Sequence, residues 1–236
     1  MNNNFNYICI SEIDRYTSVY DIHKNDTVIM NDIEVPSISL KIGDIVTFNY
    51  NNKQVTIKVN CIWTEYFRPS CVNGQCIIQM PNGKYKRIDE LDIGDLVITG
   101  NLSFAKVKCI LKTIINCEDD IYYLNNLEIT GYHPVYFNGK WDFPCNLSQF
   151  KKKTKYIDSL YSIGLENNES MIINNIVIIG LGHNIQNNLI ASHDYLGTDK
   201  VINDIFKIAP DGYCIIKPNQ IIRNKITGLI EEIKYI

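Results

Sequence analysis

The chain has 236 residues, which suits one large domain or two small ones. Hydrophobic residues make up 45% of it and charged residues 21%, the usual balance of a soluble globular protein. A formal net charge of −3 excludes a strongly basic binder of nucleic acid or of an anionic membrane surface, so we expect neither as a partner.

The sequence lacks the patterns of a signal peptide, a membrane span and a metal site. The N-terminus, Met1–Asn4, lacks the basic and apolar pattern of a signal peptide, and the longest apolar stretch, residues 172–181, is too short to cross a bilayer. We therefore expect a cytoplasmic or nuclear protein without disulfides. The eight cysteines form no C-x-x-C pair and match no zinc template, so we expect no metal and no cofactor.

Short apolar runs alternate with turn signals along the chain. Runs rich in Ile, Val and Tyr that are joined by Asn and Gly are typical of β-hairpins, and they predict an all-β fold. Only Asp199–Ile208, with apolar side chains on one face, indicates a helix. The lysines of Lys151–Lys153 are interpreted as a solvated loop. The predicted strands with a following turn are Ile77–Met80, Leu96–Thr99, Ile121–Leu124, Val135–Phe137 and Ser170–Ile173.

Residues 1–70 are predicted to form a small β domain of their own. The run Leu40–Val46 is similar to Leu91–Val97, and the similar segments Val59–Ile62 and Val107–Ile110, each with a cysteine, follow them. A duplicated β unit would explain this echo, and so would two hairpins with the same turn requirement. Two copies do not make a repeat array.

The most specific pattern begins at Cys71. An Asn-Gly turn at Gly83 and the run Leu91–Val97 follow it, and this order resembles the opening block of a Hint domain, the hedgehog/intein module. The run Leu127–Val135, which contains T-x-x-H-P-V, resembles the second Hint block. The later segments Asn138–Pro144, Leu160–Ile163, Ile172–Ile176 and Gly180–Ile202 resemble the Vint subfamily, the Hint variant associated with von Willebrand factor A domains.

This resemblance covers residues 71 to about 208 and implies three parts. A small N-terminal β domain, residues 1–70, would be the segment that is cleaved off. A Hint horseshoe of β-strands would occupy residues 71–184, and a short α+β extension of the Vint type would occupy residues 185–236. The overall class would be all-β.

The resemblance also implies a chemistry at the bond between Ser70 and Cys71. The Cys71 thiolate closes a five-membered ring on the Ser70 carbonyl carbon, so the attack is intramolecular and turns the amide into a thioester. The leaving amine needs a proton, and His133 is the candidate donor. The Thr130 hydroxyl would either hold the scissile amide or stabilise the oxyanion, and the sequence leaves this open.

Simpler interpretations stay open beside this one. Cys71 would be an inert thiol in a turn and Cys76 the reactive one; His133 would open a strand before Pro134; Thr130 would be an ordinary strand residue. A zinc site from Cys71, Cys76, Cys109 and Cys117 is allowed by composition but fits no usual spacing.

The sequence departs from the family pattern at three places. The expected His-Asn pair at the end of the last strand is replaced by Ile179-Gly180, and His183-Asn184 comes four residues later, before Ile185. Splicing is therefore not expected, and a folded extension is expected to hold Gly182–Gln186 as a strand. Glu169 stands where intein-like hairpins usually carry a His. Lys112 stands near the Asp with which hedgehog proteins activate cholesterol, so sterol transfer is not implied.

We expect a single-turnover, self-cleaving domain that forms a thioester at Ser70–Cys71. The thioester would be cleaved or transferred to an acceptor nucleophile, which is water, a thiol or an amine, and a protein partner is also conceivable. The alternative is a catalytically silent Hint fold that serves as a structural or protein-binding module. The roles of His183 and His193 stay open.

Overall fold

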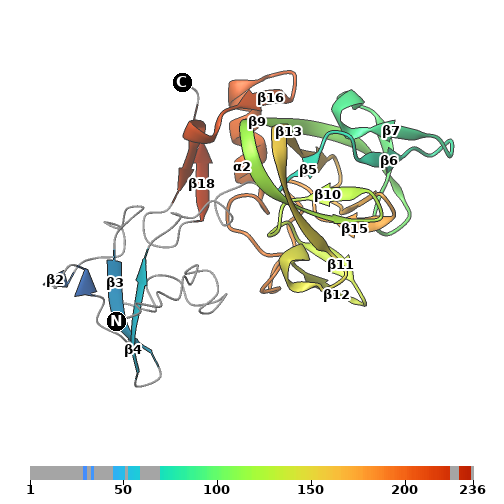
Figure 1. The fold of residues 1–236 in the computed structure, drawn as a ribbon. Coiled ribbons are helices and arrows are strands. Elements are labelled where there is room, and N and C mark those ends of the chain that lie inside the picture. Colours follow the sequence, from blue (N-terminus) through green and yellow to red (C-terminus); the bar gives the residue numbers. More distant parts are fainter. Residues whose placement is uncertain are drawn as a thin grey trace. The chain divides into compact units, whose positions relative to one another are not determined.

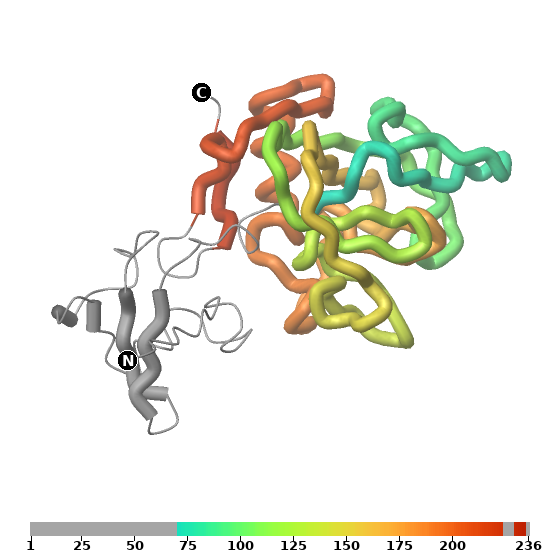
Figure 2. Tube along the Cα trace, viewed as in Figure 1, coloured from blue at the N-terminus to red at the C-terminus, as the bar shows by residue number. Residues whose placement is uncertain are grey.

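A computed structural model describes residues 70–223 and 229–234 with their side chains, and the backbone of four short strands before them. The chain divides into two compact units. One comprises Met1–Phe67 and Arg223–Leu229, and the other comprises Arg68–Ile222 and Ile230–Ile236. Figure 2 follows the second unit in colour along the chain.

The described strands of the first unit form one antiparallel sheet in the order β2-β1-β3-β4. The described strands of this unit therefore have the predicted β structure. Strand β3 contains Ile45 and Val46 of the run Leu40–Val46, which is similar to Leu91–Val97. The rest of that run, Leu40–Asp44, lies outside the described residues. The strands are β1 (Ile29–Met30), β2 (Ile33–Glu34), β3 (Ile45–Tyr50) and β4 (Lys53–Lys58).

Two long antiparallel strands lie at the centre of the first large sheet of the second unit (Figure 1). They are β9 (Phe104–Leu124) and β13 (Lys151–Leu165), and their pairing runs from Lys151 opposite Tyr123 to Leu165 opposite Val107. The register shifts between Ile157 and Ser159, where Asn116 on the opposite strand has φ 51° and marks a β-bulge.

Shorter strands complete the sheet that contains this pair, and others form a second sheet. The first sheet has the order β10-β5-β13-β9-β16, with β8 paired to β9, and the second has the order β12-β11-β15-β14-β6-β7. The bounds of these shorter strands are β5 (Val72–Asn73), β6 (Ile77–Gln79), β7 (Tyr85–Arg87), β8 (Leu96–Ile98), β10 (Leu127–Ile129), β11 (Val135–Phe137), β12 (Lys140–Asp142), β14 (Met171–Ile173), β15 (Ile176–Ile178) and β16 (Tyr213–Ile216). A separate two-stranded sheet consists of β17 (Ile221–Arg223) and β18 (Ile230–Ile233). The 3-10 turns are η3 (Ile88–Glu90), η4 (Pro144–Asn146) and η5 (Pro218–Gln220).

Asparagine pairs close the hairpins, as the sequence predicts. Asn125 and Asn126 between β9 and β10 have φ 50° and 66°, and Asn174 and Asn175 between β14 and β15 have φ 47° and 63°. A left-handed backbone at both central positions is the type I′ turn that suits two-residue hairpin loops, and asparagine tolerates it. The predicted all-β class is confirmed.

Two expectations about strands are wrong. Residues 121–124 are not a separate short strand but the end of β9. Lys151–Lys153 are not a loop, because their backbone pairs with Tyr123–Ile121 of β9 while their side chains stay exposed. One of these lysines, Lys152, forms an ion pair with Asp120 at 2.7 Å.

The C-terminal extension, residues 185–236, packs onto the sheet that contains β9. The α-helix α2 (Asp199–Ile208) matches the predicted segment, and its buried face, with Val201, Ile202 and Ile205, packs against Cys109 and Leu111 of β9. Strand β16 pairs in parallel with β9 (Figure 1). Within the described part of the chain, no helix is long and apolar enough to span a membrane.

Candidate active site

The peptide bond before β5 lies where three strands of the first sheet meet. Strand β5 is hydrogen-bonded between β10 and β13, because Val72 is paired with Ile129 on one side and with Tyr161 on the other. Cys71 directly precedes this strand and is completely buried. The bond between Ser70 and Cys71 is therefore presented to side chains from both neighbouring strands.

Thr130 binds the amide of Cys71. It follows the end of β10, and its backbone N–H donates to the Cys71 carbonyl oxygen at 3.0 Å. Its Oγ1 accepts a hydrogen bond from the Cys71 backbone N–H at 3.2 Å. Thr130 thus lies on the nitrogen of the Ser70–Cys71 bond and not on the Ser70 carbonyl oxygen, which are the two positions that the sequence leaves open.

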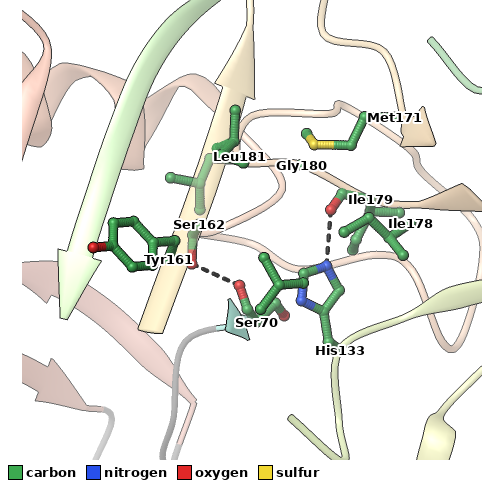
Figure 3. Close-up of a pocket in the computed structure, with 11 residues that line it drawn as sticks. Ser70, His133, Tyr161, Ser162, Met171, Ile178, Ile179, Gly180 and Leu181 are labelled. Atoms are coloured by element: carbon green, nitrogen blue, oxygen red, sulfur yellow. Dashed lines mark hydrogen bonds between the residues drawn. The ribbon is translucent and has the colours of Figure 1, made fainter. Parts of the chain in front are cut away.

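The T-x-x-H spacing is that of a turn. The His133 backbone N–H donates to the Thr130 carbonyl oxygen at 3.1 Å, which brings both side chains to the same end of β10. The His133 ring is 2% exposed, and its Nε2 lies 2.9 Å from the Ile179 carbonyl oxygen. A carbonyl only accepts, so Nε2 carries the hydrogen and Nδ1 presents a lone pair. Figure 3 shows this ring beside Ser70.

Burial lowers the pKa of His133 from 6.5 to about 4. The backbones of Ile179 and Cys71 raise this pKa but do not outweigh the loss of hydration, and nearby His183 lowers it further. The Nδ1 atom is buried and forms no hydrogen bond of normal geometry with any described residue. At neutral pH the ring is therefore uncharged, with its hydrogen on Nε2.

Ser162 is a site residue that the sequence did not reveal. Its Oγ donates to the Ser70 carbonyl oxygen at 2.6 Å (Figure 3). The same Oγ lies 3.1 Å from the Cys71 Sγ. The sequence signal was one polar residue within the otherwise apolar, buried end of β13. Pairing across 92 residues brings it to the bond, and local sequence does not show that.

The comparisons with known proteins identify a family for this chain. The family model of the Vint Hint-domain matches residues 70–232, and the match begins at Ser70. The chain belongs to the Vint family of Hint domains. The family and the fold are of the autoprocessing type.

Several solved inteins have a similar structure to this Vint domain. The DnaB intein from Synechocystis sp. PCC 6803 has 13% identity and a TM-score of 0.40, with 48% of this chain and 99% of that one covered. A bacterial intein-like domain from Clostridium thermocellum has 14% identity and a TM-score of 0.40, with the same two shares covered. The gp41-1 intein has 17% identity and a TM-score of 0.36, with 48% and 100% covered. No curated protein matched the chain.

Cys76, the alternative nucleophile, lies in an unreactive setting in the Vint domain. Its Sγ accepts a hydrogen bond from the Glu128 backbone N–H at 3.2 Å, and burial raises the pKa of the thiol to about 11. The thiolate is the nucleophilic form, so this thiol is a poor candidate at neutral pH. Among the residues with described side chains, no three His, Cys, Asp or Glu side chains are grouped as metal ligands would be.

A small cavity adjoins the bond. The space that the centre of a water molecule can reach in it is about 10 Å³, which is enough for about one water. The lining is mostly apolar. It consists of Ser70, Val72, His133, Tyr161, Ser162, Ile163, Met171, Ile178, Ile179, Gly180 and Leu181 (Figure 3).

His183 and His193 stabilise turns of the extension. The Nδ1 of His183 accepts from the Ile185 backbone N–H at 3.0 Å. The Nδ1 of His193 accepts from Tyr195 and Leu196 at 3.1 and 3.0 Å. Neither lines the cavity beside Ser70.

His133 and His183 should make the fold sensitive to acid. Burial lowers the pKa of both imidazoles from 6.5 to about 4. Between these values the unfolded chain binds more protons than the folded one, so the free energy of unfolding should fall as the pH drops from 7 to 5, by about 2 kcal/mol per histidine. Urea unfolding at both pH values measures this, and His183→Gln should remove roughly half of the dependence. Equal stability at the two pH values would contradict it.

Proposed function

We propose that the Vint domain breaks its own chain at Ser70–Cys71 by an N–S acyl shift. The observation that carries this proposal is the arrangement around one buried peptide bond. The carbonyl oxygen of Ser70 accepts a hydrogen bond from Ser162, the nitrogen of Cys71 donates one to Thr130, and a neutral His133 lies beside Ser70. Groups at both ends of a scissile bond are what acyl transfer requires.

The bond changes are the following. The Cys71 sulfur forms a bond to the Ser70 carbonyl carbon, the bond from that carbon to the Cys71 nitrogen breaks, and the nitrogen becomes an amine. The net movement is one proton, from the thiol to the nitrogen. Because the sulfur and the carbonyl carbon belong to adjacent residues, no translational entropy is lost in bringing them together.

His133 serves the nitrogen in this scheme. With the hydrogen on Nε2 fixed by the Ile179 carbonyl, Nδ1 takes up the proton that originates from the Cys71 thiol and then delivers it to the leaving amine. A pKa of about 4 keeps Nδ1 unprotonated at the start of the reaction. Thr130 holds the nitrogen in place while it changes from a planar amide to an amine.

The acceptor of the acyl group is proposed to be small. The cavity beside Ser70 has room for about one water, so water or a small thiol or amine fits better than a bulky lipid. Hydrolysis would release residues 1–70 with a free carboxylate at Ser70.

The test is to incubate the purified chain at neutral pH with and without a thiol, which attacks thioesters. We expect fragments of about 8 and about 19 kDa on a denaturing gel, in proportion to their 70 and 166 residues of the 27.2 kDa chain. A chain that stays whole under both conditions would instead support the silent, structural Hint module.

The extension is expected to stay covalently joined to the Hint core. Gly182–Gln186 is not the expected strand, because Gly182 and Asn184 have φ 65° and 54°. The backbone of Asn184 is nonetheless fixed, since its N–H donates to the Gly197 carbonyl oxygen at 2.7 Å. The following residue, Ile185, has no nucleophilic side chain that could accept an acyl group.

Mass spectrometry of the larger fragment under denaturing conditions checks this expectation. After long incubation the fragment should still end at Ile236. A species that ends in a succinimide at Asn184, and that disappears in Asn184→Ala, would overturn it.

A further inference from the structure

Ser162 touches both atoms that react in the proposed acyl shift. Its Oγ lies 2.6 Å from the Ser70 carbonyl oxygen (Figure 3) and 3.1 Å from the Cys71 sulfur. The side chain is 3% exposed. It stands on the part of β13 that is paired on one side with β5 and on the other with β9, where Ser162 is opposite Leu111. A rigid element of this kind holds a catalytic group with little freedom.

The hydrogens in these two contacts have a fixed direction. A hydroxyl carries one hydrogen and two lone pairs, and a carbonyl oxygen has no hydrogen to give. Donation from Ser162 to the Ser70 oxygen therefore leaves only lone pairs of Oγ toward the Cys71 sulfur, so in that contact the thiol is the donor. The contacts form a chain from thiol to hydroxyl to carbonyl oxygen.

His133 is not hydrogen-bonded to the thiol. Its Nε2 is engaged by Ile179, and its buried Nδ1 has no hydrogen-bond partner among the described residues. The residues that line the cavity include no lysine or arginine. An uncompensated oxyanion in such a buried, mostly apolar site is costly.

We propose that Ser162 is a catalytic residue that relays a proton during the addition step. As the C–S bond forms, the thiol hydrogen passes to Ser162 Oγ, and the original Ser162 hydrogen passes to the Ser70 oxygen. The π electron pair of the carbonyl becomes the new O–H bond, so the tetrahedral adduct is neutral and Ser162 is regenerated. This inference rests on the proposed acyl shift and adds to it the route of the first proton.

The decisive variants are Ser162→Ala and, as a control on the same strand, the half-buried Ser159→Ala. Ser162→Ala should slow thioester formation by about 10²–10³-fold, the range for losing one donor to a developing oxyanion. Ser159→Ala should react at the parent rate. Ser162→Thr keeps the hydroxyl and should be much faster than Ser162→Val, which has nearly the same shape without it.

The solvent isotope effect separates a relay from a structural role. In the parent, two protons move in the addition step, so the ratio of rates in H₂O and D₂O should be large, and it should shrink in Ser162→Ala and Ser162→Val. A purely structural serine would leave this ratio unchanged. If Ser162→Ala does not fold, which urea unfolding will reveal, the Thr and Val pair gives the same comparison.

The outcomes distinguish this inference from the proposed function. If Cys71→Ala still cleaves, the acyl shift itself is wrong. If Cys71→Ala is inert but Ser162→Ala matches the parent in rate, or is slower with an unchanged isotope ratio, then the acyl shift stands and the relay through Ser162 is wrong.

Discussion

Replacing Cys71 with alanine should abolish cleavage of the chain completely. The proposed reaction begins with the bond from the Cys71 sulfur to the Ser70 carbonyl carbon, and alanine offers no nucleophile at that position. The loss should be total and not a matter of degree. Incubation of the Cys71→Ala chain with a thiol, followed by a denaturing gel, measures it.

Cys76→Ala is the matched control for this experiment. Cys76 is also buried, and it is five residues away, but burial raises the pKa of its thiol to about 11 and its sulfur is hydrogen-bonded to the backbone of Glu128. Cys76→Ala should therefore cleave as the parent does. If Cys71→Ala produced the two fragments at the parent rate, the proposed mechanism would be wrong, and if Cys76→Ala alone were inert, Cys76 would be the nucleophile.

Replacing His133 with alanine should slow thioester formation by about 10²–10⁴-fold, the usual effect of losing a general acid or base. Without the imidazole, no described side chain with a titratable nitrogen lines the cavity beside Ser70. The leaving amine would then have to obtain its proton from water. Quenched time points analysed by intact mass spectrometry give the rate constant.

His183→Ala provides the comparison. Burial lowers the pKa of His183 to about 4, as it does for His133, but His183 stabilises a turn of the extension and does not line the cavity. Its replacement should change the rate little. Thr130→Ala should have a smaller effect than His133→Ala, because it removes a hydrogen bond and not the proton carrier. An unchanged rate in His133→Ala would show that this histidine has only a structural role.

Much of this fold could be predicted from local sequence. Hairpin turns are coded by residues next to one another, so the asparagine pairs at Asn125 and Asn174 predicted where strands end. The helix at Asp199–Ile208 has a 3.6-residue period, which is also a local property. The spacing of Thr130 and His133 is one β-turn, so these two residues could be found as a motif.

What depends on register could not be predicted in this way. The length of β9 is hidden by polar residues around Asn116, where the strand bulges, and only the pairing with β13 shows that the strand continues. Ser162 reaches the Ser70 carbonyl through that same pairing. The low pKa of His133 results from its burial, which residues from distant parts of the chain produce together. Long-range contacts of this kind leave no local signal.

Trapping the thioester with hydroxylamine tests the central claim most directly. Hydroxylamine attacks a thioester carbonyl, so freshly purified chain that is treated with it should yield an N-terminal fragment of residues 1–70 that ends in a hydroxamate at Ser70. Intact and peptide mass spectrometry identify both the cut bond and the new end group. Cleavage at Ser70–Cys71 with a hydroxamate on Ser70 is the predicted result. A Ser70–Cys71 bond that stays intact would contradict the account.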